Sequence, residues 1–286
     1  MKKLISLALA VLLCIGSLLL FSCSNKPKPN PITDFEYGYR EEYGGMSITK
    51  YIGTSKSIVF PEEIDGQPVK IIGGYLLDEG EMRPLIESVV IPDTVKVIAP
   101  MAFFRCKNLL SVDFGEGVRE IQDFAFAECT ALKKILLPPK LEKIGADAFY
   151  GCSSATELFI PKTLAVWAPS VSYGTFAKCT ALHTITIEDG LEVLGGEYGS
   201  FTQTTALKSL VIPASVKKIA AYAFHESISL ESVTFLGDAP EVSLGVFGVS
   251  GEESQTVSQN LTIYYDPATA GWDNTPLRQY RLVPMD

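Results

Sequence analysis

Histidine, tryptophan and closely spaced cysteine are scarce in this chain. It has two histidines, two tryptophans and six cysteines among 286 residues, and no two cysteines stand in a Cys-x-x-Cys pair. Structural zinc sites use such short spacings, so we expect no bound metal. His183 and His225 have no recognisable nucleophile or metal-binding motif beside them. Both are expected to be surface residues.

Basic runs and catalytic motifs are also lacking. The chain has 24 Lys and Arg against 33 Asp and Glu, a net charge of −9, so nucleic acid is not an expected partner. Its carboxylates are scattered and single out no glycosidase pair. Gly73-Gly74 and Gly195-Gly196 have nothing like a phosphate-binding loop around them. We therefore predict a protein that is not an enzyme, with no catalytic residue and no cofactor.

The first 34 residues predict export. Residues 1–22 hold two lysines and then an apolar run, which is typical of a secretory signal. Leu20-Phe21-Ser22-Cys23 resembles a bacterial lipobox, and the resemblance implies cleavage before Cys23 and lipidation of its thiol. An uncleaved helical anchor is the alternative, because about 18 apolar residues is the lower limit for a membrane span. Residues 23–34 are rich in proline and read as an extended tether.

One phrase recurs along the rest of the chain. Its aromatic mark falls at seven phenylalanines: Phe103, Phe126, Phe149, Phe176, Phe201, Phe224 and Phe247. Most steps between these marks are 23 residues long. A fixed period of this length predicts a solenoid, in which one rung cannot bury its apolar face without neighbours.

Each rung carries three apolar stripes. The first reads Leu-x-x-Ile-x-Ile, as in Leu132, Ile135 and Leu137, and its alternation predicts a strand with one buried face. The second stripe reads Val/Leu-x-x-Ile, and the third contains the phenylalanine. Proline follows the first stripe at Pro92, Pro138, Pro161 and Pro213, where its missing N–H ends ladder pairing. We predict a mostly β solenoid of about eight rungs with parallel strands.

Both ends of the array differ from the repeats. Residues 35–60 contain two alternating segments around Gly44-Gly45, which predicts a hairpin. We assign residues 35–83 to this cap and a first irregular repeat, 84–259 to the repeat array, and 260–286 to a C-terminal cap. In that cap we expect 261–265 to be the last strand and Trp272 to cover the core.

The repeat phrases resemble a known family. "IPDTVKVIAPMAFFRC", "LPPKLEKIGADAFYGC" and "IPASVKKIAAYAF" are similar to leucine-rich repeats of the BspA type. The resemblance covers roughly residues 46–265. It implies a right-handed, leucine-rich-repeat-type solenoid used for binding at bacterial or protozoan surfaces. The family has no common ligand, so the resemblance assigns no binding residue.

Four cysteines occupy one repeat position, three residues after the phenylalanine. They are Cys106, Cys129, Cys152 and Cys179. Stacked Cβ atoms would lie ~4.8 Å apart against ~3.8 Å in a disulfide, which disfavours a disulfide ladder. Later rungs have Thr204 and Ser227 in this slot, so we expect small buried side chains there.

Two groups of outward residues are candidates for ligand binding. Leu136 and Phe159 fall on adjacent rungs of the first stripe, flanked by Lys134 and Glu157. An exposed apolar spot with a charged rim favours recognition, although aromatic and branched residues also suit strands for their own sake.

The second group comes from insertions in two neighbouring rungs, which would bring Tyr173 and Tyr198 together. Sequence drift in a tolerant loop is the alternative.

These observations predict a lipid-anchored, extracytoplasmic binding or adhesion scaffold. It would recognise a protein or glycan through its repeat surface, with host extracellular matrix among the candidate ligands. The membrane is a partner through the lipid on Cys23, and we expect a monomer. The predicted location is the outer membrane or cell surface, with the periplasmic face as an alternative. The alternative function is a structural envelope or periplasmic spacer without a dedicated ligand.

Overall fold

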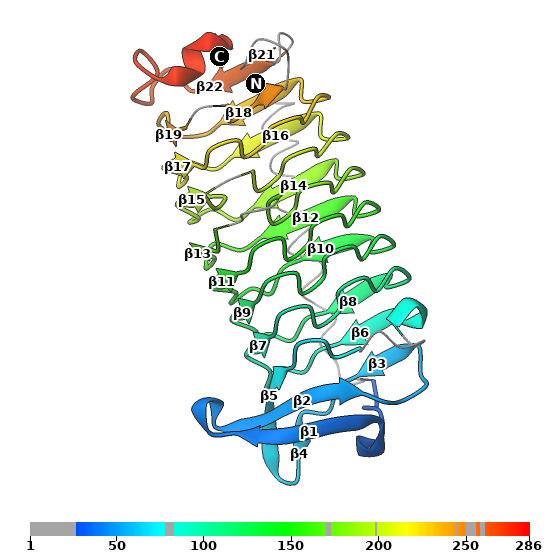
Figure 1. The fold of residues 1–286 in the computed structure, drawn as a ribbon. Coiled ribbons are helices and arrows are strands. Elements are labelled where there is room, and N and C mark those ends of the chain that lie inside the picture. Colours follow the sequence, from blue (N-terminus) through cyan, green and yellow to red (C-terminus); the bar gives the residue numbers. More distant parts are fainter. Residues whose placement is uncertain are drawn as a thin grey trace.

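The protein is an elongated rod built from a stack of similar turns (Figure 1). The computed structural model describes residues 27–77, 83–169, 173–197, 199–243, 245–249, 256–257 and 261–286. The predicted signal segment 1–22, Cys23 and Tyr198 lie outside these ranges. The described residues contain no α-helix; their strands stack in parallel as a β-solenoid of about nine turns.

One side of the rod, which we call the first face, carries the strands of the first stripe. Three parallel sheets follow one another along it: β3-β6-β8, β10-β12-β14 and β16-β18-β22-β23. These strands are β3 (Ser57–Val59), β6 (Ser88–Val90), β8 (Ser111–Asp113), β10 (Lys134–Leu136), β12 (Glu157–Ile160), β14 (Thr184–Ile187), β16 (Ser209–Ile212), β18 (Ser232–Phe235), β22 (Thr262–Tyr265) and β23 (Arg281–Pro284).

The second face carries the shorter strands of the second stripe. Its first sheet runs β1-β2-β5-β7-β9-β11-β13 with β4 on β5, and its second runs β15-β17-β19. The strands are β1 (Phe35–Arg40), β2 (Gly45–Tyr51), β4 (Glu63–Ile64), β5 (Gln67–Ile72), β7 (Val97–Ile98), β9 (Glu120–Ile121), β11 (Lys143–Ile144), β13 (Val166–Trp167), β15 (Val193–Leu194), β17 (Lys218–Ile219) and β19 (Glu241–Val242).

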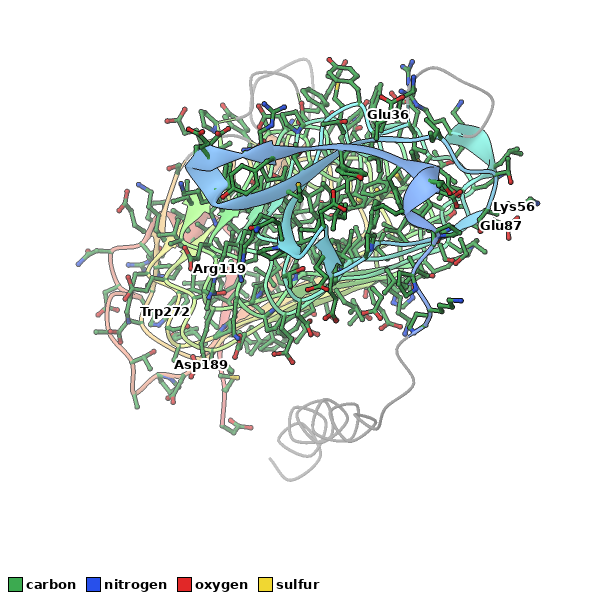
Figure 2. The ribbon with its side chains drawn as sticks, turned by 90° about the horizontal axis from the view of Figure 1, so that it is seen from below. Glu36, Lys56, Glu87, Arg119, Asp189 and Trp272 are labelled. Atoms are coloured by element: carbon green, nitrogen blue, oxygen red, sulfur yellow. The ribbon has the colours of Figure 1, made fainter. Side chains whose placement is uncertain are left out.

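The predicted alternation is confirmed in the first-face strands. In β12, Leu158 and Ile160 are buried while Glu157 and Phe159 are partly exposed. Pro161 then follows without a donor and turns the chain toward the second face. Side chains from both faces fill the interior, as the view along the rod shows (Figure 2). At one corner of that view, Lys56 Nζ lies 3.0 Å from Glu87 Oε1 on the next turn.

The third side of each rung is held by a column of stacked phenylalanines. The rings of Phe103, Phe126 and Phe149 lie 5.1 Å apart from one to the next, with interplanar angles of 13° and 8°. The same stacking continues through Phe176, Phe201, Phe224 and Phe247. All seven side chains are buried. The repeated aromatic mark is therefore a continuous core column along the array.

The backbone around these phenylalanines forms its own ladder. Phe103 N–H donates to the Ala125 carbonyl at 2.8 Å, and Arg105 N–H donates to the Ala127 carbonyl at 2.8 Å. This pairing requires left-handed backbone on both sides of the phenylalanine, as at Met101 (φ 57°) and Arg105 (φ 62°). Other rungs have the same conformation at Phe124, Glu128, Asp147, Lys178, Gln203, Tyr222 and Glu226. Each such residue costs about 1–2 kcal/mol of backbone strain, so the stacked rungs must hold it in place.

The N-terminal cap is the predicted hairpin with an additional anchored segment. β1 and β2 pair antiparallel, joined by the 3-10 turn η2 (Glu41–Tyr43) and Gly44 at φ 60°. β4 and β5 form a second small hairpin around Asp65 and Gly66, both at positive φ. Asn30 already pairs with Val59, donating through its N–H at 2.9 Å and accepting through Oδ1 at 2.8 Å. The packed chain thus begins at Asn30, inside the segment predicted as tether.

The C-terminal cap differs from the prediction in one strand. β22 is not the last strand of the first face, because β23 pairs parallel to it. Between them the chain passes the 3-10 turn η4 (Pro276–Gln279), and β23 lacks the repeat phrase that marked the other strands. Trp272 covers the core as expected: it is buried and stacks on Tyr265 with ring centroids 4.7 Å apart.

We expect Phe149→Ala to destabilise the protein by about 3–5 kcal/mol. The substitution opens a cavity in the middle of the column, between rings at 5.1 Å and 5.6 Å. Denaturant unfolding followed by circular dichroism measures the change. Leu110→Ala is the matched control, because Leu110 is 46% exposed and its loss should cost less than about 0.5 kcal/mol. Equal effects of the two substitutions would contradict a structural role for the column.

Candidate functional site

The first face presents two straight columns of outward side chains. Parallel pairing places Leu136 beside Phe159 and Phe159 beside Thr186, with Lys134, Glu157 and Thr184 in the next column. The same register aligns Val211, Thr234, Tyr264 and Val283 farther along. The predicted placement of Leu136 and Phe159 on adjacent rungs, flanked by Lys134 and Glu157, is confirmed by this register. The first column is largely apolar and the second largely hydroxylated or charged.

The candidate residues Lys134, Leu136, Glu157 and Phe159 form one contiguous spot. Leu136 is 48% exposed and Phe159 is half-buried beside it. Lys134 Nζ lies 2.9 Å from Glu157 Oε1 and 3.0 Å from Oε2. Both charged side chains are well exposed, so the pair contributes at most about 1 kcal/mol to stability. We call these four residues the β10–β12 patch.

Tyr173 has a neighbour that the sequence analysis did not predict. Its ring stacks on Tyr150 of the preceding rung with centroids 4.6 Å apart. Lys178 Nζ lies over both rings, 5.3 Å from the centroid of Tyr150 and 5.0 Å from that of Tyr173. A hydrogen bond with Tyr150 raises the pKa of the Lys178 ammonium group. Tyr173 is 54% exposed, so this aromatic pair faces solvent; the position of Tyr198 lies outside the described residues.

Sequence reasoning missed Tyr150 because it comes from a rung without an insertion. A signal was present: Tyr150 directly follows the phenylalanine of its rung, and Lys178 stands two residues after the next one. Tyr173 stands near the end of the inserted stretch before Phe176, and its ring lies on Tyr150 of the earlier rung.

The cysteine slot is buried, and its side chains also donate. Cys106, Cys129, Cys152 and Cys179 are all free and fully buried. The Sγ of Cys129 lies 3.2 Å from the Phe103 carbonyl oxygen of the preceding rung, and that of Cys152 lies 3.3 Å from the Phe126 oxygen. Ser227 Oγ makes the equivalent contact to the Phe201 oxygen at 3.4 Å. The slot therefore selects a small side chain with a donor.

The two histidines differ in exposure. His183 is exposed, as expected, and its Nδ1 lies 3.0 Å from Thr184 Oγ1. The outward placement predicted for His225 is wrong: it is half-buried and meets the Tyr222 ring edge-on at 5.5 Å. Among the residues with described positions, no cluster of three or more His, Cys, Asp or Glu side chains could hold a metal ion.

The structure is a repeat scaffold. Its buried positions hold the same residue types in successive rungs, while the outward residues differ from rung to rung. The chain matches the model of the BspA type leucine-rich repeat region in six copies, over residues 82–198 and 197–268. The match covers more than half of the chain. The protein therefore belongs to the BspA-type leucine-rich repeat family. Proteins with this repeat fold are scaffolds and are typically non-catalytic.

Solved structures of other leucine-rich repeat proteins are similar to this chain. A leucine-rich repeat protein of T. pallidum is 25% identical with a TM-score of 0.54, covering 77% of this chain and 90% of that one. One from Bacteroides ovatus has a TM-score of 0.61 at 23% identity over 90% of this chain and 67% of that one, and supports the fold alone.

A leucine-rich cell surface protein from Faecalibacterium prausnitzii is 27% identical with a TM-score of 0.57. The alignment covers 74% of this chain and 56% of that protein, which is therefore considerably longer than the shared region. No curated protein sequence matches the chain. Over the part of the chain with described coordinates, no helix has the length and apolar character needed to cross a membrane.

We expect the four repeat cysteines to be unreactive in the folded protein. Burial raises the pKa of the Cys179 thiol to about 12 and holds that of Cys152 well above its usual value. The thiolate that attacks a disulfide reagent is therefore almost absent at pH 8. Ellman's reagent should modify none of the four until denaturant is added, and then all of them. Mass spectrometry of tryptic peptides measures each site, and rapid native labelling of Cys129 or Cys152 would contradict this packing.

Proposed function

We propose that the protein is a lipid-anchored, non-catalytic scaffold that binds a protein ligand through its first face. The observation that supports this most directly is the β10–β12 patch, where Leu136 and Phe159 lie side by side in the outward column. Strands pack well with polar residues on their solvent face, so apolar side chains there are not required by the fold. Partly exposed apolar residues rimmed by charge are typical of recognition surfaces.

The apolar column extends beyond the patch. Val211 is 47% exposed and Tyr264 is 36% exposed in the register-aligned positions of later strands. A row of such residues on a paired sheet can contact an extended partner at several points, and its backbone is already ordered before binding. Thr186 and Thr234 lie between these residues and offer hydroxyls to the partner. The host extracellular matrix is a ligand class that fits a surface of this length, and adhesion would follow from anchoring and binding together.

Export and lipidation rest on the sequence of residues 1–23. The lipobox-like Leu20-Phe21-Ser22-Cys23 supports an anchor on the outer membrane or cell surface. Asn30, docked on β3, leaves only the short segment from Cys23 to Pro29 as a tether. A spacer in the envelope without a dedicated ligand is the second candidate function, and it would not need the apolar column. An enzymatic role has no supporting constellation of residues.

Replacing both Leu136 and Phe159 by Lys should abolish ligand binding and leave the fold intact. Both side chains point outward, so the core is unchanged, while two cations would have to be desolvated against an apolar partner. Surface plasmon resonance on a panel of immobilised extracellular-matrix proteins measures binding. We expect at least tenfold weaker binding to any protein that the unaltered chain recognises.

Val166→Lys is the matched control, because Val166 is 48% exposed, like Leu136, and lies on the opposite second face. Equal binding of the double variant and this control would refute the β10–β12 patch. If the unaltered chain binds no member of the panel, the spacer function gains the support instead.

Cys23→Ala should release the protein from the membrane. Lipid chains contribute ~0.8 kcal/mol per buried methylene, and the substitution removes their point of attachment. Fractionation of cells, together with metabolic labelling by a fatty-acid analogue, reports both location and modification. Cys14→Ala, within the apolar run, is the control and should leave both unchanged. A Cys23→Ala protein that still carries label and stays in the membrane fraction would contradict lipidation at this residue.

A further inference from the structure

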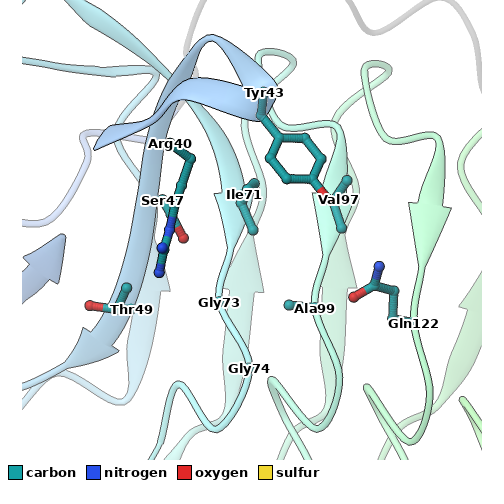
Figure 3. Close-up of a pocket in the computed structure, with 10 residues that line it drawn as sticks. All are labelled: Arg40, Tyr43, Ser47, Thr49, Ile71, Gly73, Gly74, Val97, Ala99 and Gln122. Atoms are coloured by element: carbon teal, nitrogen blue, oxygen red, sulfur yellow. The ribbon is translucent and has the colours of Figure 1, made fainter. Parts of the chain in front are cut away.

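A pocket lies at the N-terminal end of the second face, where the β1–β2 hairpin overhangs the rungs (Figure 3). It has a volume of about 270 Å³. Arg40 and Tyr43 reach into it from the hairpin, and Ile71 and Val97 form its apolar floor. Ser47, Thr49, Gly73, Gly74, Ala99 and Gln122 complete the lining. Drug-sized ligands occupy about 300–1,000 Å³, so this space suits a smaller molecule.

The hairpin covers the floor residue Val97, as a comparison of exposed fractions along its column shows. Val97 shares an outward column with Glu120, Lys143 and Val166. Val97 is only 6% exposed, whereas Val166 is 48% exposed in the equivalent position. The cap therefore encloses one segment of an otherwise open sheet face.

Glycine keeps the middle of the floor free of side chains. Gly73 N–H donates to the Ile48 carbonyl at 2.7 Å, and a Cβ on Gly73 would also lie 2.7 Å from that oxygen. Any larger residue would push β5 away from β2. The close approach of these strands leaves backbone at the base of the pocket, with space above it for a ligand.

The lining combines an aromatic ring with several polar groups. Ser47 is 3% exposed, and its hydroxyl lies at the pocket (Figure 3). A hydroxyl can both donate to a ligand and accept from it. Gln122 Nε2 donates to Glu120 Oε1 at 2.8 Å, which fixes the orientation of its amide. Tyr43 presents a partly exposed ring over the apolar floor.

Arg40 is the one charged residue in the lining of the pocket. Within the described residues, no carboxylate lies within 4.0 Å of the Arg40 guanidinium group. Lys70 and Lys96 precede the floor residues Ile71 and Val97, and their backbones pair at 2.8 Å. Arg119 continues this column on the next rung.

The cations of this column are close enough to influence one another. Burial lowers the pKa of the Lys96 ammonium group, and the charges of Lys70, Arg119 and Lys140 lower it further. An anion bound nearby would relieve this repulsion. Three acids stand near the lining in the sequence: Glu41 and Glu42 between Arg40 and Tyr43, and Glu120, which accepts from Gln122.

We propose that this pocket binds one carboxylate-bearing sugar, of the hexuronic acid class, at the end of a glycan chain. The Tyr43 ring and the floor of Ile71 and Val97 contact the apolar C–H faces of the sugar. Its hydroxyls pair with Ser47, Thr49 and Gln122. Its carboxylate accepts two hydrogen bonds from the guanidinium group of Arg40, the geometry that Arg favours. The site is separate from the β10–β12 patch and does not depend on it.

Titration of the purified protein with glucuronic acid, followed by saturation-transfer NMR and calorimetry, tests this proposal. We expect saturable binding of glucuronic acid and at least tenfold weaker binding of glucose, which lacks the carboxylate. Arg40→Ala should weaken glucuronic acid binding about tenfold or more and remove its preference over glucose. Tyr43→Ala should weaken both sugars, because the ring contacts the sugar face and not its charge.

Arg281→Ala is the matched control, since Arg281 is an exposed cation at the other end of the rod. It should leave sugar binding unchanged, and so should the Leu136→Lys, Phe159→Lys double variant. The proposal is overturned if glucuronic and galacturonic acids show no saturable binding up to about 10 mM, weaker than most specific ligands. It is also overturned if Arg40→Ala, with an unchanged unfolding midpoint, binds as well as the Arg281→Ala control.

Discussion

The stacking of identical side chains at a fixed spacing is the constraint on which the rest of this structure depends. Parallel strands lie about 4.8 Å apart, and the phenylalanine rings repeat at 4.8–5.7 Å along the column. A ring stacked at this distance fills the rung completely, so each rung must supply the same residue at the same place. The cysteine slot follows the same rule, because its donor must reach the carbonyl of the preceding phenylalanine. The residues that face solvent are free of this constraint, which is why surface chemistry can vary from rung to rung.

Much of the fold could be predicted because the stacked positions repeat. The alternation around Leu158 and Ile160 gave the strands and their inward face, and repetition then gave the register of Leu136 and Phe159 without further information. The left-handed ladder was missed, although Gly151, Gly174 and Gly199 occupy its positions in some rungs. Other rungs place Glu128 or Lys178 there, and neither residue type signals positive φ by itself. β23 was missed for a related reason: it has no repeat phrase and is held only by pairing with β22.

The candidate sites depend on long-range contacts that no periodic pattern encodes. Tyr173 contacts Tyr150 of the preceding rung, and the length of an insertion does not predict which side chain its last residues will contact. The pocket exists because η2 carries Tyr43 over Val97, two segments far apart in the sequence. None of the pocket residues belongs to a sequence motif that predicts a binding site. The two proposed binding regions lie on different faces, so a protein on the first face would leave the pocket accessible to a glycan.

The location of the repeat array decides between a scaffold for external ligands and a component of envelope structure. Treating intact cells with a protease and blotting for this protein, beside a periplasmic control, measures it directly. Our account predicts that the protein is degraded while the control is spared, because the anchored array faces outward. If the protein survives until the envelope is opened, it faces the periplasm, and a role in binding external ligands is contradicted.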